Sequence, residues 1–171
     1  MRVLTTVVLV ASASLATSRN LLFPGNTQHA LVDTQGAPIP GKNPLTYCES
    51  TDDYILDIDY INISPNPPVI GESFEIEAQG TLAKNITEGA YIILEVSFGF
   101  IKLLHQTVSL CDQVGNVNLS CPVEKGEVKI VKSASIPKEA PPGQYTVRAD
   151  VYNADEEKIT CLLGEKIPMH K

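Results

Sequence analysis

Tryptophan is absent from this sequence of 171 residues, and histidine and cysteine are scarce, with three and four residues respectively. So few side chains of these types offer little material for a metal cluster or a nucleophile–base pair. The phosphate-binding glycine loop and the G-x-S-x-G and H-E-x-x-H motifs are missing as well. His105 has no acidic neighbour in the sequence. We therefore predict no enzyme activity, no catalytic residues, no metal site and no cofactor.

Basic residues are in deficit, since 13 lysines and arginines stand against 20 aspartates and glutamates, which gives a net charge of −7. Nucleic-acid binding needs clustered cations that displace the counterions of the phosphates, so we expect no nucleic-acid partner. Strong adhesion to anionic membranes at neutral pH is disfavoured for the same reason. Hydrophobic residues make up 43% of the chain, which predicts one domain with a substantial core.

The start of the chain has the pattern of a targeting segment. Arg2 precedes an apolar run over residues 3–10, and small residues follow it up to Ala16. This is typical of a secretory signal peptide, predicted over residues 1–16. A membrane anchor is the alternative, but the run is shorter than the about 20 residues that cross a bilayer. Residues 17–44 carry turn signals without a sustained period and are interpreted as a leader or propeptide, which leaves residues 45–171 as the domain.

In a chain of the secretory pathway, the four cysteines are expected to form two disulfides. Three pairings are possible. The spacing favours Cys111–Cys121, which closes a polar loop, together with Cys48–Cys161, which ties the first strand of the domain to the last. In the chain-entropy account, a link of the second kind removes about 4–5 kcal/mol of unfolded-state freedom.

Three Asn-x-Ser/Thr triplets fit the N-glycosylation sequence. Asn85 and Asn118 lie in expected loops and are predicted to be glycosylated. Asn62 lies at a strand end before Pro65 and is a weaker candidate for glycosylation than Asn85 and Asn118.

Apolar and polar residues alternate with a period of two over residues 56–60, 74–78, 92–98 and 145–151. This alternation is typical of half-buried strands. Segments rich in proline and glycine separate these stretches. The pattern predicts an all-β fold, an antiparallel β-sandwich of about seven strands.

Residues 91–110 are the most informative stretch for function, because they are long for strands and very apolar. Gly99 predicts a bend between two strands there. One wall of the sandwich therefore carries an excess of Phe, Ile and Leu side chains. A filled core and a cavity for an apolar ligand have the same period, so the sequence pattern leaves both interpretations open.

Five segments of the domain together resemble a known family. They are Tyr60-Ile61-Asn62-Ile63-Ser64-Pro65-Asn66-Pro67-Pro68, Gly71-Glu72, Ile76-Glu77-Ala78-Gln79-Gly80, Pro141-Pro142-Gly143-Gln144-Tyr145-Thr146-Val147 and Ile159-Thr160-Cys161-Leu162. These segments resemble the ML lipid-recognition family, most closely its fungal phosphatidylglycerol/phosphatidylinositol transfer branch, whose members are counterparts of the soluble sterol-transfer protein of Niemann–Pick disease type C. The resemblance covers roughly residues 45–167.

This resemblance implies an immunoglobulin-like sandwich whose sheets admit a lipid between them. It also implies delivery of sterol, within the vacuole or lysosome lumen, to a membrane-embedded Niemann–Pick-type sterol transporter. Alignment on Cys111 places the family's pocket positions near Leu103, Ile136 and Tyr145. Animal members have a third, short-range disulfide for which this chain has no cysteines, so the cavity mouth is expected to differ.

Two hypotheses for function follow. The first is an intermembrane lipid carrier, expected to be a monomer with transient membrane contact, that holds sterol, phosphatidylinositol or phosphatidylglycerol. The alternative is a secreted adhesion or receptor-binding sandwich with a solid core. The predicted lipid-binding residues of the carrier are Val96, Phe98, Phe100, Ile101, Leu103, Ile136, Tyr145 and Val147.

Overall fold

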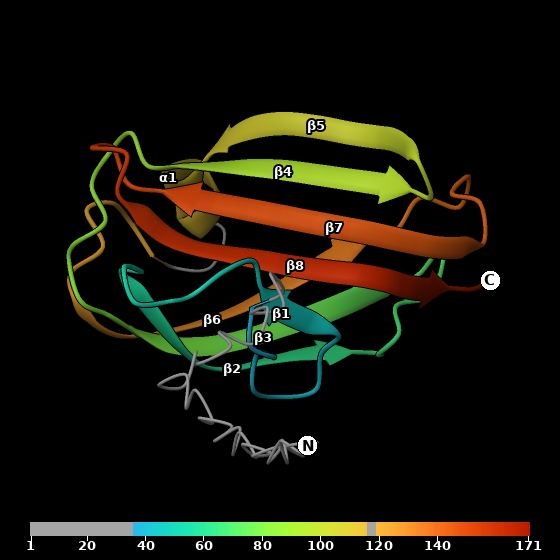
Figure 1. Cartoon of the computed structure of the whole chain (residues 1–171), viewed down its shortest axis with the longest axis horizontal. Helices are drawn as coiled ribbons and strands as arrows, with labels where there is room; N and C mark the ends of the chain where they lie inside the picture. Colours follow the sequence, from blue (N-terminus) through green and yellow to red (C-terminus); the bar gives the residue numbers. More distant parts are fainter. Residues whose placement is uncertain (1–35, 116–118) are drawn as a thin grey trace, which may run out of the picture. The chain divides into compact units, whose positions relative to one another are not determined.

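The computed structural model describes residues 36–115 and 119–171, and almost all of its regular structure is β-strand (Figure 1). Its elements in chain order are β1 (Leu45–Tyr47), β2 (Leu56–Ser64), β3 (Ser73–Leu82), β4 (Tyr91–Phe98), β5 (Ile101–Ser109), α1 (Leu110–Val114), β6 (Gly126–Ser135), β7 (Gly143–Tyr152) and β8 (Lys158–Met169). Over the described ranges, no helix has the length and apolar character needed to cross a membrane.

The strands form two antiparallel sheets that lie face to face (Figure 1). The five-stranded sheet has the order β1-β8-β7-β4-β5, and the three-stranded sheet has the order β2-β3-β6. The predicted all-β sandwich is confirmed. It has eight strands rather than about seven, because the three-residue β1 pairs with β8 at one edge.

The helix α1 is an addition that strand periodicity did not indicate. It begins after Ser109, whose side chain accepts a hydrogen bond from the Asp112 amide at 3.2 Å. Such a cap satisfies one of the free amides at the start of a helix. The helix therefore follows β5 directly and turns the chain from the five-stranded sheet toward the three-stranded one.

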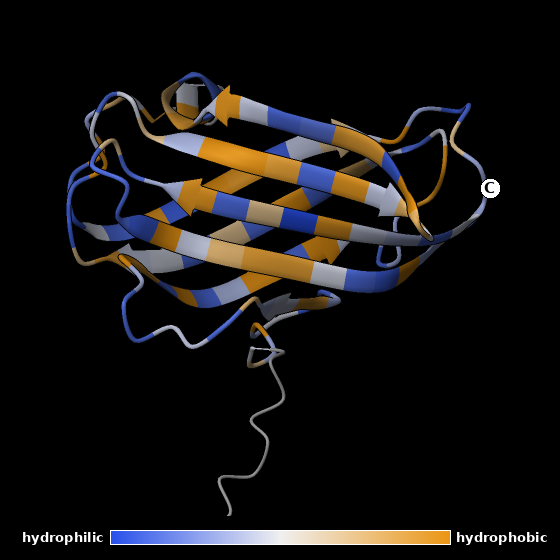
Figure 2. Cartoon of the chain, turned by 45° about the horizontal axis from the view of Figure 1, so that its top comes forward, coloured by the Kyte–Doolittle hydropathy of each residue, from blue (hydrophilic) through white to orange (hydrophobic). Residues whose placement is uncertain are grey.

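Alternation sets the inner and outer faces of the strands. In β6, half-buried and exposed residues alternate without exception over all ten positions. Figure 2 shows the same alternation of apolar and polar residues along the strands of both sheets. Because successive side chains of a strand point to opposite faces, one face of each sheet is apolar and turns toward the other sheet.

The buried residues between the sheets form three separate clusters. One contains Leu82, Val151 and Ile159, a second contains Ile58 and Ile61, and a third contains Tyr145 and its neighbours. A domain of this size usually has one contiguous core. All eight residues of β4, which lies inside the five-stranded sheet, are only half-buried. The two sheets therefore leave space between them.

Residues 36–44, which the sequence analysis placed in the leader, contact the sandwich. Ile39 is only 4% exposed, and the amides of Ile61 and Ile63 donate to the carbonyl oxygens of Pro40 and Lys42, each at 2.9 Å. A single buried isoleucine among prolines and glycines has no period, so periodicity could not have found it. The predicted signal peptide and most of the leader lie outside the described residues.

Both expected disulfides are present. Cys48 and Cys161 are bonded with a Cα–Cα distance of 5.4 Å, and Cys111 and Cys121 with a Cα–Cα distance of 5.6 Å. The first closes a loop of 113 residues and the second a loop of 10. The long loop removes the larger part of the unfolded chain's freedom, about 5 kcal/mol against about 3 kcal/mol for the short one.

Candidate functional site

A cavity of about 240 Å³ lies between the two sheets. Its wall on the three-stranded sheet consists mainly of aliphatic side chains from all three strands. Two small residues of β3, Ala78 and Gly80, also line this wall, and a Cβ at Gly80 would stand 2.5 Å from the carbonyl oxygen of Asp57 on β2. The aliphatic residues of this wall are Leu56, Ile58, Ile61, Leu82, Val128 and Ile130.

The opposite wall comes from the five-stranded sheet, and a β-bulge shapes it. Val151 pairs with Thr160 and Tyr152 pairs with Lys158, so Ile159 is an extra residue on β8. A bulge re-aims the side chains around it, and both Ile159 and Thr160 line the cavity. Thr160 is 4% exposed, and its hydroxyl has no hydrogen-bond partner within the described ranges.

One end of the cavity is closed by the segments around α1. Leu110 and Val114 of the helix and the following Leu119 line it, together with Ile86 and Val123, which pair through a short β-bridge. The Cys111–Cys121 disulfide fastens this closure to the helix. The disulfide that was predicted to close a polar loop therefore also holds the segments that cover one end of the cavity.

The lining carries no charged side chain, and its polar members are Gln79 and Thr160. Gln79 is engaged in a hydrogen bond to Glu127 at 2.9 Å. A site of this composition binds by removing apolar surface from water and offers no proton donor or acceptor pair for chemistry. Its existence also separates the two functional hypotheses, because a solid-core sandwich has no such space.

The predicted lipid-binding residues do not line this cavity. Five of them belong to the third core cluster, namely Val96, Phe98, Ile136, Tyr145 and Val147. In that cluster the rings of Phe98 and Tyr145 are 5.2 Å apart, and the Tyr145 hydroxyl donates to the carbonyl oxygen of Pro141 at 2.6 Å. This cluster packs against itself, and the contact of these five residues with a lipid stays a prediction.

The other three predicted residues lie at or near the β4–β5 hairpin and are exposed. The exposed fractions are 107% for Phe100, 63% for Ile101 and 50% for Leu103. Val96 pairs with Leu104 and Ser97 with Lys102, so Leu103 is the extra residue of a bulge in the edge strand β5. The bulge explains its exposure, because an unpaired residue at a sheet edge has few neighbours. Lipid contact at these residues also stays a prediction.

The stretch Ile76-Glu77-Ala78-Gln79-Gly80 is a sequence signal for this cavity, because Ala78 and Gly80 are small residues on the inner face of β3, whose other residues are large and apolar. Interpreting those positions required knowledge of what lies opposite them. The apolar run over residues 91–110 supplied Ile92 and Leu110 to the lining, whereas its aromatic centre lies outside it.

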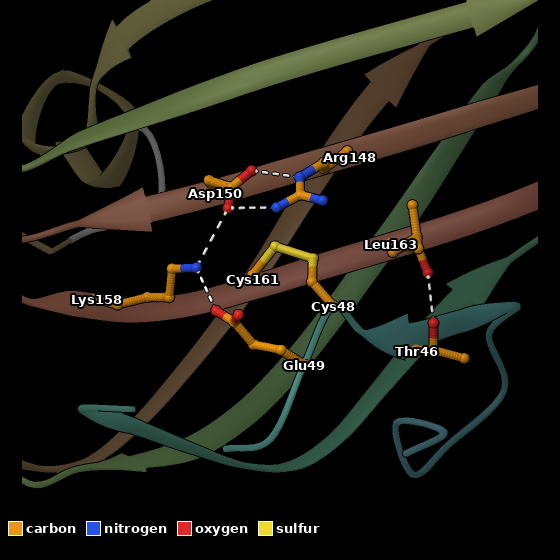
Figure 3. The surroundings of a disulfide bond; sticks show 8 residues. All are labelled: Thr46, Cys48, Glu49, Arg148, Asp150, Lys158, Cys161 and Leu163. Atoms are coloured by element: carbon orange, nitrogen blue, oxygen red, sulfur yellow. Dashed lines mark hydrogen bonds and ion pairs between the residues drawn. A yellow bond between two sulfur atoms is a disulfide. The ribbon is translucent and has the colours of Figure 1, made fainter. Parts of the chain in front are cut away.

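A charge cluster lies on the outer face of the five-stranded sheet, beside the Cys48–Cys161 disulfide (Figure 3). Arg148 Nε donates to Asp150 Oδ2 at 2.6 Å, and Lys158 reaches both Asp150 Oδ1, at 3.6 Å, and Glu49. Burial by itself raises the pKa of Asp150, but the hydrogen bonds and charges of Arg148 and Lys158 outweigh burial and hold that pKa below its ordinary value.

Within the described part of the chain, Cys48, Asp150 and Cys161 are the one group of potential metal ligands close enough to share an ion. Their sulfur atoms are bonded to each other in the disulfide, so neither is available as a thiolate ligand. The charge cluster around Asp150 is therefore a structural network on the outside of the sheet, and it lies on the face opposite the cavity.

The predicted glycosylation sites differ in their setting. Asn85 is exposed and its Oδ1 accepts the amide of Lys125 at 2.8 Å, whereas Asn62 is half-buried and accepts the amide of Lys42 at 2.9 Å. Asn118 lies outside the described residues. Glycan attachment at Asn85 and Asn118 stays a prediction.

The fold and the cavity together define a disulfide-linked β-sandwich with an apolar interior space. The family model described as the ML domain matches residues 42–166, and the chain belongs to this family. The match begins at residue 42, within the segment of residues 36–44 that packs on the sandwich.

Relatives with the name phosphatidylglycerol/phosphatidylinositol transfer protein are similar over most of their length. The one from Aspergillus oryzae is 44% identical over 155 residues, which is 91% of this chain and 89% of the relative. The one from Kluyveromyces lactis is 43% identical over 171 residues, covering 96% of this chain and 95% of the relative. Among solved structures, a Niemann-Pick type C2 protein from the Japanese carpenter ant has the same fold, with a TM-score of 0.52 and 17% identity, covering 72% of this chain and 98% of its own.

Proposed function

We propose that this protein is a lipid carrier that holds the apolar part of a lipid in the cavity between its sheets and transfers it between membranes. The observation that carries the proposal is the uncharged, aliphatic lining of that cavity. The names of the relatives support phosphatidylglycerol and phosphatidylinositol as cargo. The family resemblance adds sterol as a second class of cargo.

The energetics suit a carrier that must release its cargo. A lipid that buries about 400 Å² of apolar surface gains about 10 kcal/mol from the hydrophobic effect. Association costs several kcal/mol in lost translational, rotational and conformational freedom. The difference leaves an affinity that is useful and still reversible, as transfer requires.

The cavity must enlarge to hold a whole lipid. Its volume of about 240 Å³ is below the about 300–1,000 Å³ of typical small-ligand sites. Room for enlargement exists beside it, because the inward residues Leu94, Val96 and Val147 are only half-buried. The edge strands β5 and β6 are each paired on one side only, so the sheets can separate along that side without breaking a strand pair.

The setting of this activity is part of the proposal. The carrier acts as a monomer in the lumen of the secretory pathway or vacuole, contacts membranes transiently and delivers sterol to a membrane-embedded transporter of the Niemann–Pick type. The support is the signal-like start of the sequence and the family resemblance. No catalytic step is part of the proposal.

A matched pair of variants on β6 tests the carrier. Ile130 lines the cavity, whereas the next residue, Val131, is exposed on the outer face. In Ile130→Trp the added ring occupies the cavity, so transfer of fluorescent sterol and of fluorescent phosphatidylinositol from donor to acceptor vesicles should fall at least about tenfold. In Val131→Trp the same ring lies outside, and transfer should remain within about twofold of the unmodified protein.

Two results would overturn the proposal. One is the absence of saturable binding and transfer of either lipid by the unmodified protein. The other is an equal effect of Ile130→Trp and Val131→Trp when both variants keep the circular dichroism of the folded protein. A third variant, Leu103→Trp, locates the cargo: because Leu103 is half-exposed at its bulge, we expect a smaller loss of transfer than in Ile130→Trp.

A further inference from the structure

Lys132 is a cation on the cavity side of β6. In the antiparallel register it lies opposite Ile76, and it shares its face with Val128 and Ile130, which line the cavity. Lys132 is half-buried, whereas Lys129 and Val131, on the other face of the same strand, are exposed. A strand alternates its faces at every residue, so this lysine belongs to the inner face and not to the solvated one.

The ammonium group of Lys132 is bound to a neutral partner. Its Nζ donates to the side-chain oxygen of Gln113 at 2.7 Å, and Gln113 belongs to α1, directly before the cavity-lining Val114. Lys129 differs, because its Nζ forms an ion pair with Glu77 at 2.7 Å. An amide oxygen accepts a hydrogen bond but carries no opposite charge, so the bond to Gln113, unlike the ion pair of Lys129, does not compensate the cation of Lys132 beside the apolar space.

This position is on the side where the sandwich can open. The Lys132–Gln113 hydrogen bond joins β6 to α1, and α1 directly follows β5, so the unpaired edges of both sheets lie next to it. On β5, Leu104 pairs with the inward Val96 and is still 36% exposed. A ligand that enters the cavity between β5 and β6 therefore passes Leu104 of β5 on one side and Lys132 of β6 on the other.

We propose that Lys132 binds the phosphate of an anionic phospholipid whose apolar chain occupies the cavity. The phosphate oxygens replace the amide oxygen of Gln113 as acceptors, so a hydrogen bond between two opposite charges replaces one between the ammonium group and a neutral amide. The lysine thereby selects anionic phospholipids over ligands without a phosphate, such as sterols. This inference rests on the proposed carrier function and assigns its headgroup specificity to one residue.

The test compares three variants of the full chain. Lys132→Gln removes the charge, Lys132→Arg keeps it, and Lys129→Gln removes a lysine from the outer face of the same strand. Each is assayed for transfer of fluorescent phosphatidylglycerol and of fluorescent sterol between neutral vesicles, and for competition by inorganic phosphate. Circular dichroism and thermal unfolding of each variant confirm that it is folded.

We expect Lys132→Gln to weaken phosphatidylglycerol binding about tenfold or more and to leave sterol binding within about twofold, because only the charge-assisted hydrogen bond is lost. Lys132→Arg should restore most of the phosphatidylglycerol binding, and Lys129→Gln should change neither lipid. Inorganic phosphate at millimolar concentration should not displace the lipid, since it gains nothing from the apolar cavity.

Three outcomes would overturn the assignment. The first is phosphatidylglycerol transfer by Lys132→Gln at the rate of the unmodified protein. The second is an equal loss of sterol and phosphatidylglycerol, which would make Lys132 a structural residue. The third is displacement of the lipid by inorganic phosphate, which would make the site a free-anion site. Failure of the carrier function itself gives a different result. In that case the unmodified protein transfers neither lipid, and the role assigned to Lys132 is overturned as well.

Discussion

The ring of Phe98 lies so close to Gly143 that a Cβ on this glycine would stand 2.5 Å from Cε2 of the ring. Phe98 ends β4 and Gly143 begins β7, so the contact closes the end of the five-stranded sheet where these two strands pair. The backbone φ of Gly143 is +151°, in the region that favours glycine. Both facts require the absence of a side chain at position 143.

Gly143→Ala is therefore expected to lower the free energy of unfolding by about 1–3 kcal/mol, through the clash with the Phe98 ring and the backbone strain. Urea denaturation monitored by circular dichroism measures the loss. Gly115→Ala is the matched control, because its φ is −56° and a Cβ there meets nothing within 4 Å. Equal stability of the two variants would show that Phe98 can move away at no cost.

The ion pairs of Asp150 predict a loss of stability in acid. Arg148 and Lys158 hold the pKa of the Asp150 carboxyl below its ordinary value of 3.8, so the unfolded chain binds a proton at a pH where the folded chain does not. The stabilisation is therefore complete above the unfolded value and declines as the pH falls through it toward the folded pKa. The charge cluster should remain intact at mildly acidic pH.

Asp150→Asn tests this expectation. Above about pH 5 the variant should be less stable than the unmodified protein, and the difference should shrink steadily below about pH 4, where the native carboxyl is protonated as well. Urea denaturation at a series of pH values measures the difference. Asp53→Asn, at an exposed turn, is the control and should follow the unmodified protein throughout. A difference that persists undiminished at pH 2 would contradict the assignment.

The segment before β1 should contribute to stability although it has almost no regular structure. A chain that begins at Leu45 loses the buried Ile39 side chain and the hydrogen bonds to the amides of Ile61 and Ile63. Compared with a chain that begins at Gly36, it should be less stable by about 3 kcal/mol or more. Guanidinium denaturation of the two chains measures the difference, and Ile39→Ala in the longer chain should reproduce about 2–4 kcal/mol of it. Identical midpoints would place the domain start at residue 45.

Strand periodicity predicted the inner faces well because a strand presents alternate residues to the core whatever its partner is. Residues 56–60, 74–78, 92–98 and 145–151 lie in β2, β3, β4 and β7. The spacing of the cysteines likewise favoured the pairs that the structure contains. The alternation is a local signal, whereas the Cys48–Cys161 pair joins residues 113 positions apart. Periodicity predicted neither the burial of Ile39 nor the helix α1, because one buried residue and five helical residues are too few to show a period.

Strand periodicity did not predict the location of the cavity. The aromatic run around Phe98 was predicted to contact the ligand, and this stays a prediction; its inward members pack against Tyr145 and one another. The cavity between the sheets lies beside Ala78 and Gly80 of β3 and is closed by Val114 of α1. An apolar wall is needed for a cavity and for a core alike, so a rich supply of large side chains in one strand does not say where they leave a void.

Alternation, turn residues and short motifs predicted the class of fold and the family, because they are properties of short stretches of chain, and cysteine spacing favoured one of three possible pairings. The position of the empty space, and of the charge beside it, followed from the packing of the two sheets. The volume between two sheets is set by the sum of side chains from strands far apart in the chain, and the inward position of Lys132 gains its meaning only from the sheet that faces it.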